Sequence, residues 1–238
     1  MIVLNHYVAE LDWGGHAWQL RPDRTIYWRH AQTLIMADPH FGKGQYFRGS
    51  GIPVPTGTTQ SNLNTLDAAI QATQPKRLIV LGDFFHSSGG VTSDLLDQLR
   101  VWRDRWSELE VINTRGNHDR QAGDPPEDLR IRCVASPHVD HDDTKIRFAH
   151  EPTASPKSFT LCGHLHPGVR LQGAAKSRLR TACFLFSERT AVLPAFGAFT
   201  GMKIMHPMRS DRVFAVGPDR VIEVSTINTA SSDHTISQ

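Results

Sequence analysis

The sequence predicts an α+β fold in which two β-sheets pack together with helices on the outside. In the first half of the chain, apolar runs of strand length alternate with stretches of helical periodicity, whereas after residue 128 short apolar runs dominate. Polar blocks follow several of these runs, and strand ends of this kind meet at one edge of a sheet. Because the blocks cannot be divided between two units, we expect one domain over residues 1–225 and a flexible tail over residues 226–238.

The first half of the chain supplies five strands and two helices. Short apolar runs predict strands over residues 17–20, 25–28, 33–37, 78–81 and 111–114. Apolar residues at helical spacing predict helices over residues 58–73 and 93–109, the second with Thr92 or Ser93 as its N-cap. The Gly- and Pro-rich residues 41–57, and residues 123–128, are expected to be loops.

The second half consists mainly of strands. We expect them over residues 146–149, 159–162, 183–187, 191–194, 213–216 and 221–224. Gly217-Pro218-Asp219 is typical of a hairpin turn between the last two.

The composition is that of a soluble protein of a reducing compartment. The three cysteines, Cys133, Cys162 and Cys183, are odd in number and form no CxxC pair. The N-terminus lacks a signal-peptide pattern, and no run approaches the ~18 apolar residues of a membrane span. The sequence therefore predicts a cytoplasmic location and no membrane contact. Its net charge of +2 neither requires nor excludes a polyanionic partner.

Five polar blocks carry the chemistry of this sequence. Four follow apolar runs of strand length, and the third follows a shorter one. Their carboxylate, amide and imidazole groups are ligands of divalent transition metals, so the pattern indicates metal-assisted hydrolysis. A single His is usually structural, but five compatible blocks argue against that interpretation. The blocks are Asp38-Pro39-His40, Gly82-Asp83-Phe84-Phe85-His86, Gly116-Asn117-His118-Asp119, His150-Glu151 and Gly163-His164-Leu165-His166.

Seven of these side chains suit two metal ions. Residues two apart on a strand point to the same side, so Asp38 and His40 can share one cation. The same holds for His164 and His166, unless a two-metal site separates them. Asp83 is the natural bridging carboxylate. Since one metal takes four to six ligands, seven donors fit a pair of metals that share a carboxylate, as in phosphoryl-transfer enzymes. Asn117 and His150 complete the set.

The order of the blocks resembles the calcineurin-like metallophosphoesterases. Residues 38–55 and 82–87, with His150-Glu151-Pro152, resemble more narrowly the bacterial ligase-associated DNA damage response endonuclease group, over roughly residues 15–224. The resemblance implies a four-layer αββα sandwich of two mixed sheets and a dinuclear site. Mn²⁺ is the expected metal, with Fe, Zn, Ni or Mg as alternatives.

The resemblance also implies a role for each residue. His118 is the non-ligand catalytic histidine: it assists attack by a metal-bridging hydroxide by protonating the leaving oxygen or by stabilising phosphoryl charge. Asp119 orients His118. Pro39 stands where an apolar residue such as Leu is more usual, which leaves the ligands intact. The first metal is held by Asp38, His40, Asp83 and His166, and the second by Asp83, Asn117, His150 and His164.

Residues around the blocks are candidates for substrate contact. Lys43, Arg48 and Arg115 match phosphate oxygens, with solvated surface as the alternative. His86 either lines the pocket or is structural. The densest basic cluster, Lys176-Ser-Arg178-Leu-Arg180, either follows a nucleic-acid backbone or is plain surface.

The expected function is therefore hydrolysis of phosphodiesters by a metal-dependent phosphoesterase. The resemblance extends this to a DNA endonuclease of DNA repair, functionally associated with a DNA ligase and a helicase. The alternatives are a cyclic-nucleotide phosphodiesterase, a phosphomonoesterase, or a non-catalytic interaction scaffold. The presence of His118 and of all seven ligands argues against the scaffold.

Overall fold

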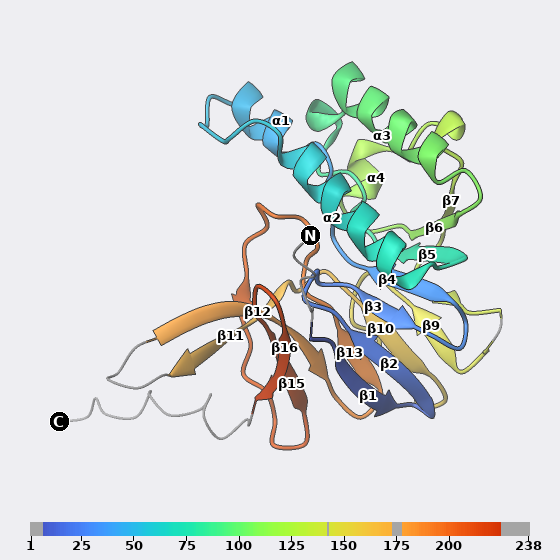
Figure 1. Ribbon diagram of the computed structural model, residues 1–238, viewed down its shortest axis with the longest axis vertical. Helices are drawn as coiled ribbons and strands as arrows, with labels where there is room; N and C mark the ends of the chain where they lie inside the picture. The colour runs from blue at the N-terminus through green and yellow to red at the C-terminus, as the bar shows by residue number, and fades with distance from the viewer. Residues whose placement is uncertain (1–6, 142, 173–177, 225–238) are drawn as a thin grey trace.

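Two mixed β-sheets packed face to face form the centre of the computed structural model, which describes residues 7–141, 143–172 and 178–224 (Figure 1). An apolar cluster that includes Trp18, Leu81, Leu161 and Phe184 fills the space between them. The α+β sandwich of two mixed sheets that the sequence predicts is confirmed.

The first sheet changes from antiparallel to parallel at β4. Its strand order is the order of the chain, from β1 to β7. β1 to β4 are antiparallel neighbours, whereas β4 to β7 run parallel. The strands are β1 (Ala9–Trp13), β2 (His16–Leu20), β3 (Ile26–Trp28), β4 (Thr33–Met36), β5 (Arg77–Val80), β6 (Glu110–Thr114) and β7 (Ile131–Val134).

The second sheet is built around β12, which pairs with β11, β13 and β15. Its main order is β14-β11-β12-β13-β10-β9-β8, and β16 pairs with β15. The strands are β8 (His138–Val139), β9 (Ile146–Phe148), β10 (Phe159–Cys162), β11 (Pro167–Gln172), β12 (Arg178–Phe186), β13 (Thr190–Val192), β14 (Lys203–Ile204), β15 (Arg212–Val216) and β16 (Val221–Val224).

The helices cover the outer face of the first sheet (Figure 1). Leu63 and Ile70 of α2 and Leu99 of α3 are buried against Leu34, Leu78 and other residues of that face. The helices are α1 (Lys43–Gly49), α2 (Thr58–Thr73), α3 (Ser93–Arg105) and α4 (Asp119–Ala122), with short 3₁₀ turns at Ser88–Gly90 and Glu127–Leu129. Within the described ranges no helix is long and apolar enough to cross a membrane.

Several boundaries differ from the prediction, and β1, β7, β8, β11 and β14 were not predicted. Residues 43–49 form α1, although the predicted loop covered them; the glycines at positions 42, 44 and 49 lower the helical propensity that a sequence pattern detects. α3 ends at Arg105 instead of residue 109. β12 begins five residues earlier than predicted, at Arg178. The predicted tail over residues 226–238, and Lys176 of the basic cluster, lie outside the described residues.

Candidate metal centre

The five polar blocks meet where the carboxyl ends of strands from both sheets lie close together. Asp38 and His40 follow β4, Asp83 follows β5, and the Gly116 block follows β6. The second sheet contributes His150 after β9 and the Gly163 block after β10. Two contacts join the sheets at this point: a bridge between Ala37 and Ala195, and a hydrogen bond from the His164 amide to Asp38 Oδ2 at 2.9 Å.

The first group of side chains contains Asp38, His40 and His166, whose ligand atoms lie within 4.8 Å of one another. The Nε2 atoms of His40 and His166 are 3.4 Å apart, and His166 Nε2 is 3.6 Å from Asp38 Oδ2. Burial lowers the pKa of His40 to about 2, so its imidazole is neutral. A neutral imidazole offers the lone pair that a metal requires.

The second group is arranged around His150. Its Nδ1–H donates to the Leu81 carbonyl at 3.0 Å, which leaves a lone pair on Nε2. Around that lone pair lie Asn117 Oδ1 at 2.8 Å and His164 Nδ1 at 3.0 Å. Electron-rich atoms this close to one another fit a cation between them.

Asp83 lies between the two groups. Its carboxylate is 3.8 Å from His40 Nε2 and 3.4 Å from His150 Nε2. It is buried, and burial raises its pKa to about 6. A buried carboxylate needs an opposite charge nearby. A metal ion bound by the donors on either side of Asp83 would supply that charge.

The residues present fit a pair of divalent metal ions. Asp38 Oδ1 is fully buried and accepts no hydrogen bond in the described part of the chain, as expected for an oxygen that binds a cation. The donor set of carboxylate, amide and imidazole suits first-row divalent metals. The structure thus brings together all seven predicted ligands.

The backbone at this centre is unusual. Five of the seven predicted ligands have positive φ angles between 46° and 67°, a region that non-glycine residues seldom adopt. Left-handed conformations at strand ends turn these side chains toward the centre, and such strain concentrates at functional sites. The five are Asp38, His40, Asp83, His164 and His166.

Glycines of the blocks allow the close approach of the ligands. A Cβ atom on Gly116 would lie 2.2 Å from Asp83 Oδ1, and one on Gly163 would lie 2.5 Å from Asp38 Oδ2. No side chain fits at these distances. The two glycines are therefore part of the centre. In the sequence, only their positions within the motifs indicate this role.

His118 lies at the rim, with about a third of its side chain exposed. Its Nδ1–H donates to the His86 carbonyl at 2.6 Å, and its ring stacks on the His86 ring at 5.0 Å. Its Nε2 is 4.0 Å from Asp83 Oδ2. The His86 carbonyl thus orients the His118 imidazole. Sequence analysis had assigned this orienting role to Asp119.

Asp119 instead supports the turn that carries Asn117 and His118. Its buried carboxylate accepts hydrogen bonds from the Gly116 amide at 2.9 Å and from Asn113 Nδ2 at 3.1 Å. It therefore fixes the backbone at Gly116, beside Asp83.

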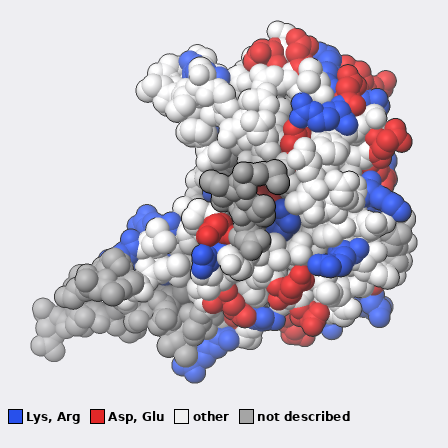
Figure 2. Space-filling model, viewed as in Figure 1, with Lys and Arg blue, Asp and Glu red and all other residues white. Residues whose placement is uncertain are grey.

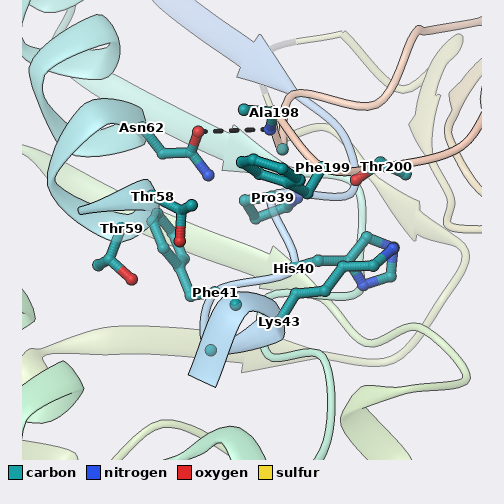
Figure 3. Close-up of a pocket in the computed structure, with 13 residues that line it drawn as sticks. Pro39, His40, Phe41, Lys43, Thr58, Thr59, Asn62, Ala198, Phe199 and Thr200 are labelled. Atoms are coloured by element: carbon teal, nitrogen blue, oxygen red, sulfur yellow. Dashed lines mark hydrogen bonds between the residues drawn. The ribbon is translucent and has the colours of Figure 1, made fainter. Parts of the chain in front are cut away.

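Lys43 is the predicted substrate contact that reaches the centre. Asp38 and Asp83 act electrostatically on its ammonium group, although burial lowers its pKa. Lys43 and His40 lie together at one side of a small pocket of about 20 Å³, which Pro39, Phe199 and Thr200 also line (Figure 3). Sequence reasoning missed the segment 197–200, because no motif precedes it.

His86 also lies at the centre, with its ring 5.3 Å from the His40 ring, whereas the two arginines bind elsewhere. Arg48 Nη1 donates to the Pro55 carbonyl at 3.0 Å and so braces the loop after α1. Arg115 forms a two-point ion pair with Asp124. Arg178 and Arg180 of the basic cluster lie exposed on β12.

Comparison with known proteins places the chain in a family. The calcineurin-like phosphoesterase family matches residues 31–182. The structure of the nuclease MPE of Pseudomonas putida is similar, with 35% identity and a TM-score of 0.79, and the match covers 91% of this chain and 100% of that one. YfcE, a phosphoesterase from E. coli, matches with 12% identity and a TM-score of 0.41 over 82% of this chain and 98% of that one. Among curated proteins there is no match.

The family match covers more than half of the chain and contains every residue of the centre described above. Its members hydrolyse phosphate esters with divalent metal ions, which agrees with the donor set found here. The chain therefore belongs to the calcineurin-like phosphoesterases and is a hydrolase of phosphate esters.

Proposed function

We propose that this chain is a DNA endonuclease that hydrolyses phosphodiester bonds with a dinuclear metal centre. The substrate class is supported by one observation: this chain is 35% identical to the Pseudomonas putida nuclease over nearly the whole of both chains. A role in DNA repair beside a DNA ligase and a helicase stays a prediction from the resemblance.

The proposal gives each ligand group of the centre one metal ion, with Asp83 shared. Asp38, His40 and His166 hold the first, and Asn117, His150 and His164 hold the second. Two bound divalent ions, with Mn²⁺ expected, lower the pKa of water and neutralise phosphoryl oxygens. The short distances around His150 Nε2 and the unpaired Asp38 Oδ1 support this arrangement.

His118 is the proposed catalytic group that binds no metal. The His86 carbonyl fixes its Nδ1–H, so Nε2 is the atom that faces the centre and the substrate. From there the imidazole can protonate the leaving oxygen or donate a hydrogen bond to a phosphoryl oxygen. Lys43, which lines the pocket of Figure 3 beside the predicted ligand His40, is placed to bind a second phosphate oxygen.

The test compares four substrates under Mn²⁺: a chromogenic phosphodiester, the matching monoester, single-stranded DNA and double-stranded DNA. We expect diester hydrolysis to exceed monoester hydrolysis, and at least one DNA to be cut internally. We expect His118→Ala to lower diester hydrolysis at least ~100-fold, because it removes the general acid.

Four results would each contradict the proposal or a part of it. Monoester hydrolysis above diester hydrolysis would indicate a phosphomonoesterase, and a small diester cleaved without any DNA cleavage would indicate a small-molecule phosphodiesterase. Full activity of His118→Ala would remove the role given to that residue. A chain that hydrolyses none of the four substrates with Mn²⁺ would favour the scaffold.

A further inference from the structure

A two-stranded ribbon projects from the body of the molecule beside the metal centre (Figure 1). It consists of residues 167–172 of β11 and residues 178–182 of β12, paired antiparallel, and we call it the arm. Arg170 lies directly opposite Arg180, and Gln172 opposite Arg178. Three arginines therefore gather on a short ribbon.

These arginines share one face of the arm. Side chains alternate along a strand, so Arg178 and Arg180 lie on the same face of β12 as Ala182, Phe184 and Phe186. Those three belong to the apolar cluster between the sheets. On this face of the second sheet, the side chains between the two sheets are apolar, whereas those in the arm are arginines.

The arginines of the arm are electrostatically unsatisfied. Within residues 7–141, 143–172 and 178–224, Arg170, Arg178 and Arg180 form no ion pair with a carboxylate. Arg170 and Arg180 also lie directly opposite each other, and like charges in that position destabilise a ribbon. Seven of the other surface arginines do have acidic partners. These are Arg100, Arg105, Arg115, Arg130, Arg132, Arg212 and Arg220.

The arm is also joined directly to the metal centre. β11 begins at the residue after His166, so Arg170 lies four residues along an extended strand, within about 14 Å of that ligand. Arg178 and Arg180 are two residues apart, about 7 Å along the strand. Figure 2 shows the surface hollowed between the arm and the lobe that carries α1, with Lys or Arg side chains where the arm leaves the body.

We propose that the arm binds the backbone of a nucleic-acid strand whose scissile phosphate lies at the metal centre. Arg170, Arg178 and Arg180 contact phosphates several nucleotides away from the cleaved bond, and arginine suits this role because its planar fork matches phosphate oxygens. The inference rests on the proposed nuclease function and adds the surface that distinguishes a polymer from a small diester.

The test variant replaces Arg170, Arg178 and Arg180 with Gln. The matched control is the triple variant Arg100→Gln, Arg130→Gln and Arg132→Gln, which removes the same charge from α3, the residue after the second 3₁₀ turn, and β7. Fluorescence anisotropy with a labelled single strand of about 20 nucleotides, in EDTA, measures binding without cleavage. Parallel assays with a labelled duplex and with a chromogenic diester complete the set.

For the arm variant we expect the Kd of the oligonucleotide to rise at least ~10-fold, and the slope of log Kd against log salt to fall by about 2, since each phosphate contact on a single strand contributes about 0.7. Hydrolysis of the small diester should stay at the wild-type rate, and the control triple should bind like the wild type. The loss should shrink as the oligonucleotide is shortened to two nucleotides.

An arm variant with wild-type Kd and salt slope for both single strand and duplex would overturn the inference. An equal loss in the control triple, or a loss that does not depend on oligonucleotide length, would also overturn it, because either indicates a general charge effect. Failure of the wild type to cut DNA contradicts the proposed function instead, and the binding assay in EDTA separates the two results.

Discussion

At the scale of single residues, the metal centre depends on backbone conformation as much as on the ligands themselves. Left-handed conformations at non-glycine residues cost of order 1 kcal/mol each, and here five of them occur among seven ligands. The packing around them must hold these conformations in place. Asp38 and Asp83 show how: their carboxylates accept backbone N–H groups of His164 and His118, both at 2.9 Å.

Gly163 offers a direct test of this residue-scale account. In Gly163→Ala the new methyl group would displace Asp38, whose Oδ2 lies 2.5 Å from the Cβ position. We expect diester hydrolysis to fall at least ~10-fold and the Mn²⁺ concentration for half-maximal activity to rise, because supporting contacts of metal ligands carry effects of this size.

Gly49→Ala is the matched control. Gly49 has a negative φ and no atom within 4 Å of its Cβ position, so activity should be unchanged. Wild-type activity and Mn²⁺ dependence in Gly163→Ala would show that Asp38 does not need its present position.

The residue types of the centre could be predicted from the sequence, but their geometry could not. Spacing and chemistry indicated the seven ligands, and the family resemblance implied the role of His118. Strand alternation was the stated reason for pairing Asp38 with His40, yet both residues have left-handed backbones just after β4. The engagement of Arg48 with the Pro55 carbonyl and of Arg115 with Asp124 depends on tertiary contacts that no sequence pattern records.

At the scale of elements, helix ends show how tertiary contacts decide boundaries. Apolar periodicity predicted that α3 reaches residue 109, because Trp106 and Leu109 continue the apolar face. In the structure the buried Arg103 guanidinium donates to the carbonyls of Leu129, Trp106 and Leu109. These bonds hold the residues after Arg105 in a non-helical path and join α3 to the second 3₁₀ turn.

Arg103→Met should therefore destabilise the protein by at least about 4 kcal/mol, since three carbonyl groups lose a charged donor and each such bond contributes about 1.5 kcal/mol or more. Urea unfolding monitored by circular dichroism measures the change. Arg100→Met, on the exposed side of the same helix, should leave the free energy of unfolding close to that of the wild type, because its ion pairs lie at the surface. Equal stability of the two variants would show that Arg103 does not determine the end of α3.

At the scale of the whole molecule, the sandwich brings the carboxyl ends of β4, β5 and β6 to those of β9 and β10 (Figure 1). The sequence predicted both sheets from the change in strand pattern, but short strands with few apolar residues, such as β8 and β14, left no such signal. The packing of the two sheets determines which ligands meet, since Asp38 and His164 come from different sheets.

The central claim is a centre of two metal ions that share Asp83. Equilibrium dialysis with Mn²⁺, followed by metal analysis, counts the ions bound per chain. We predict two for the wild type, fewer than one for Asp83→Asn, and two for the control Asp124→Asn, whose carboxylate pairs with Arg115 at the surface. One ion in the wild type, or two in a folded Asp83→Asn variant, would contradict the account.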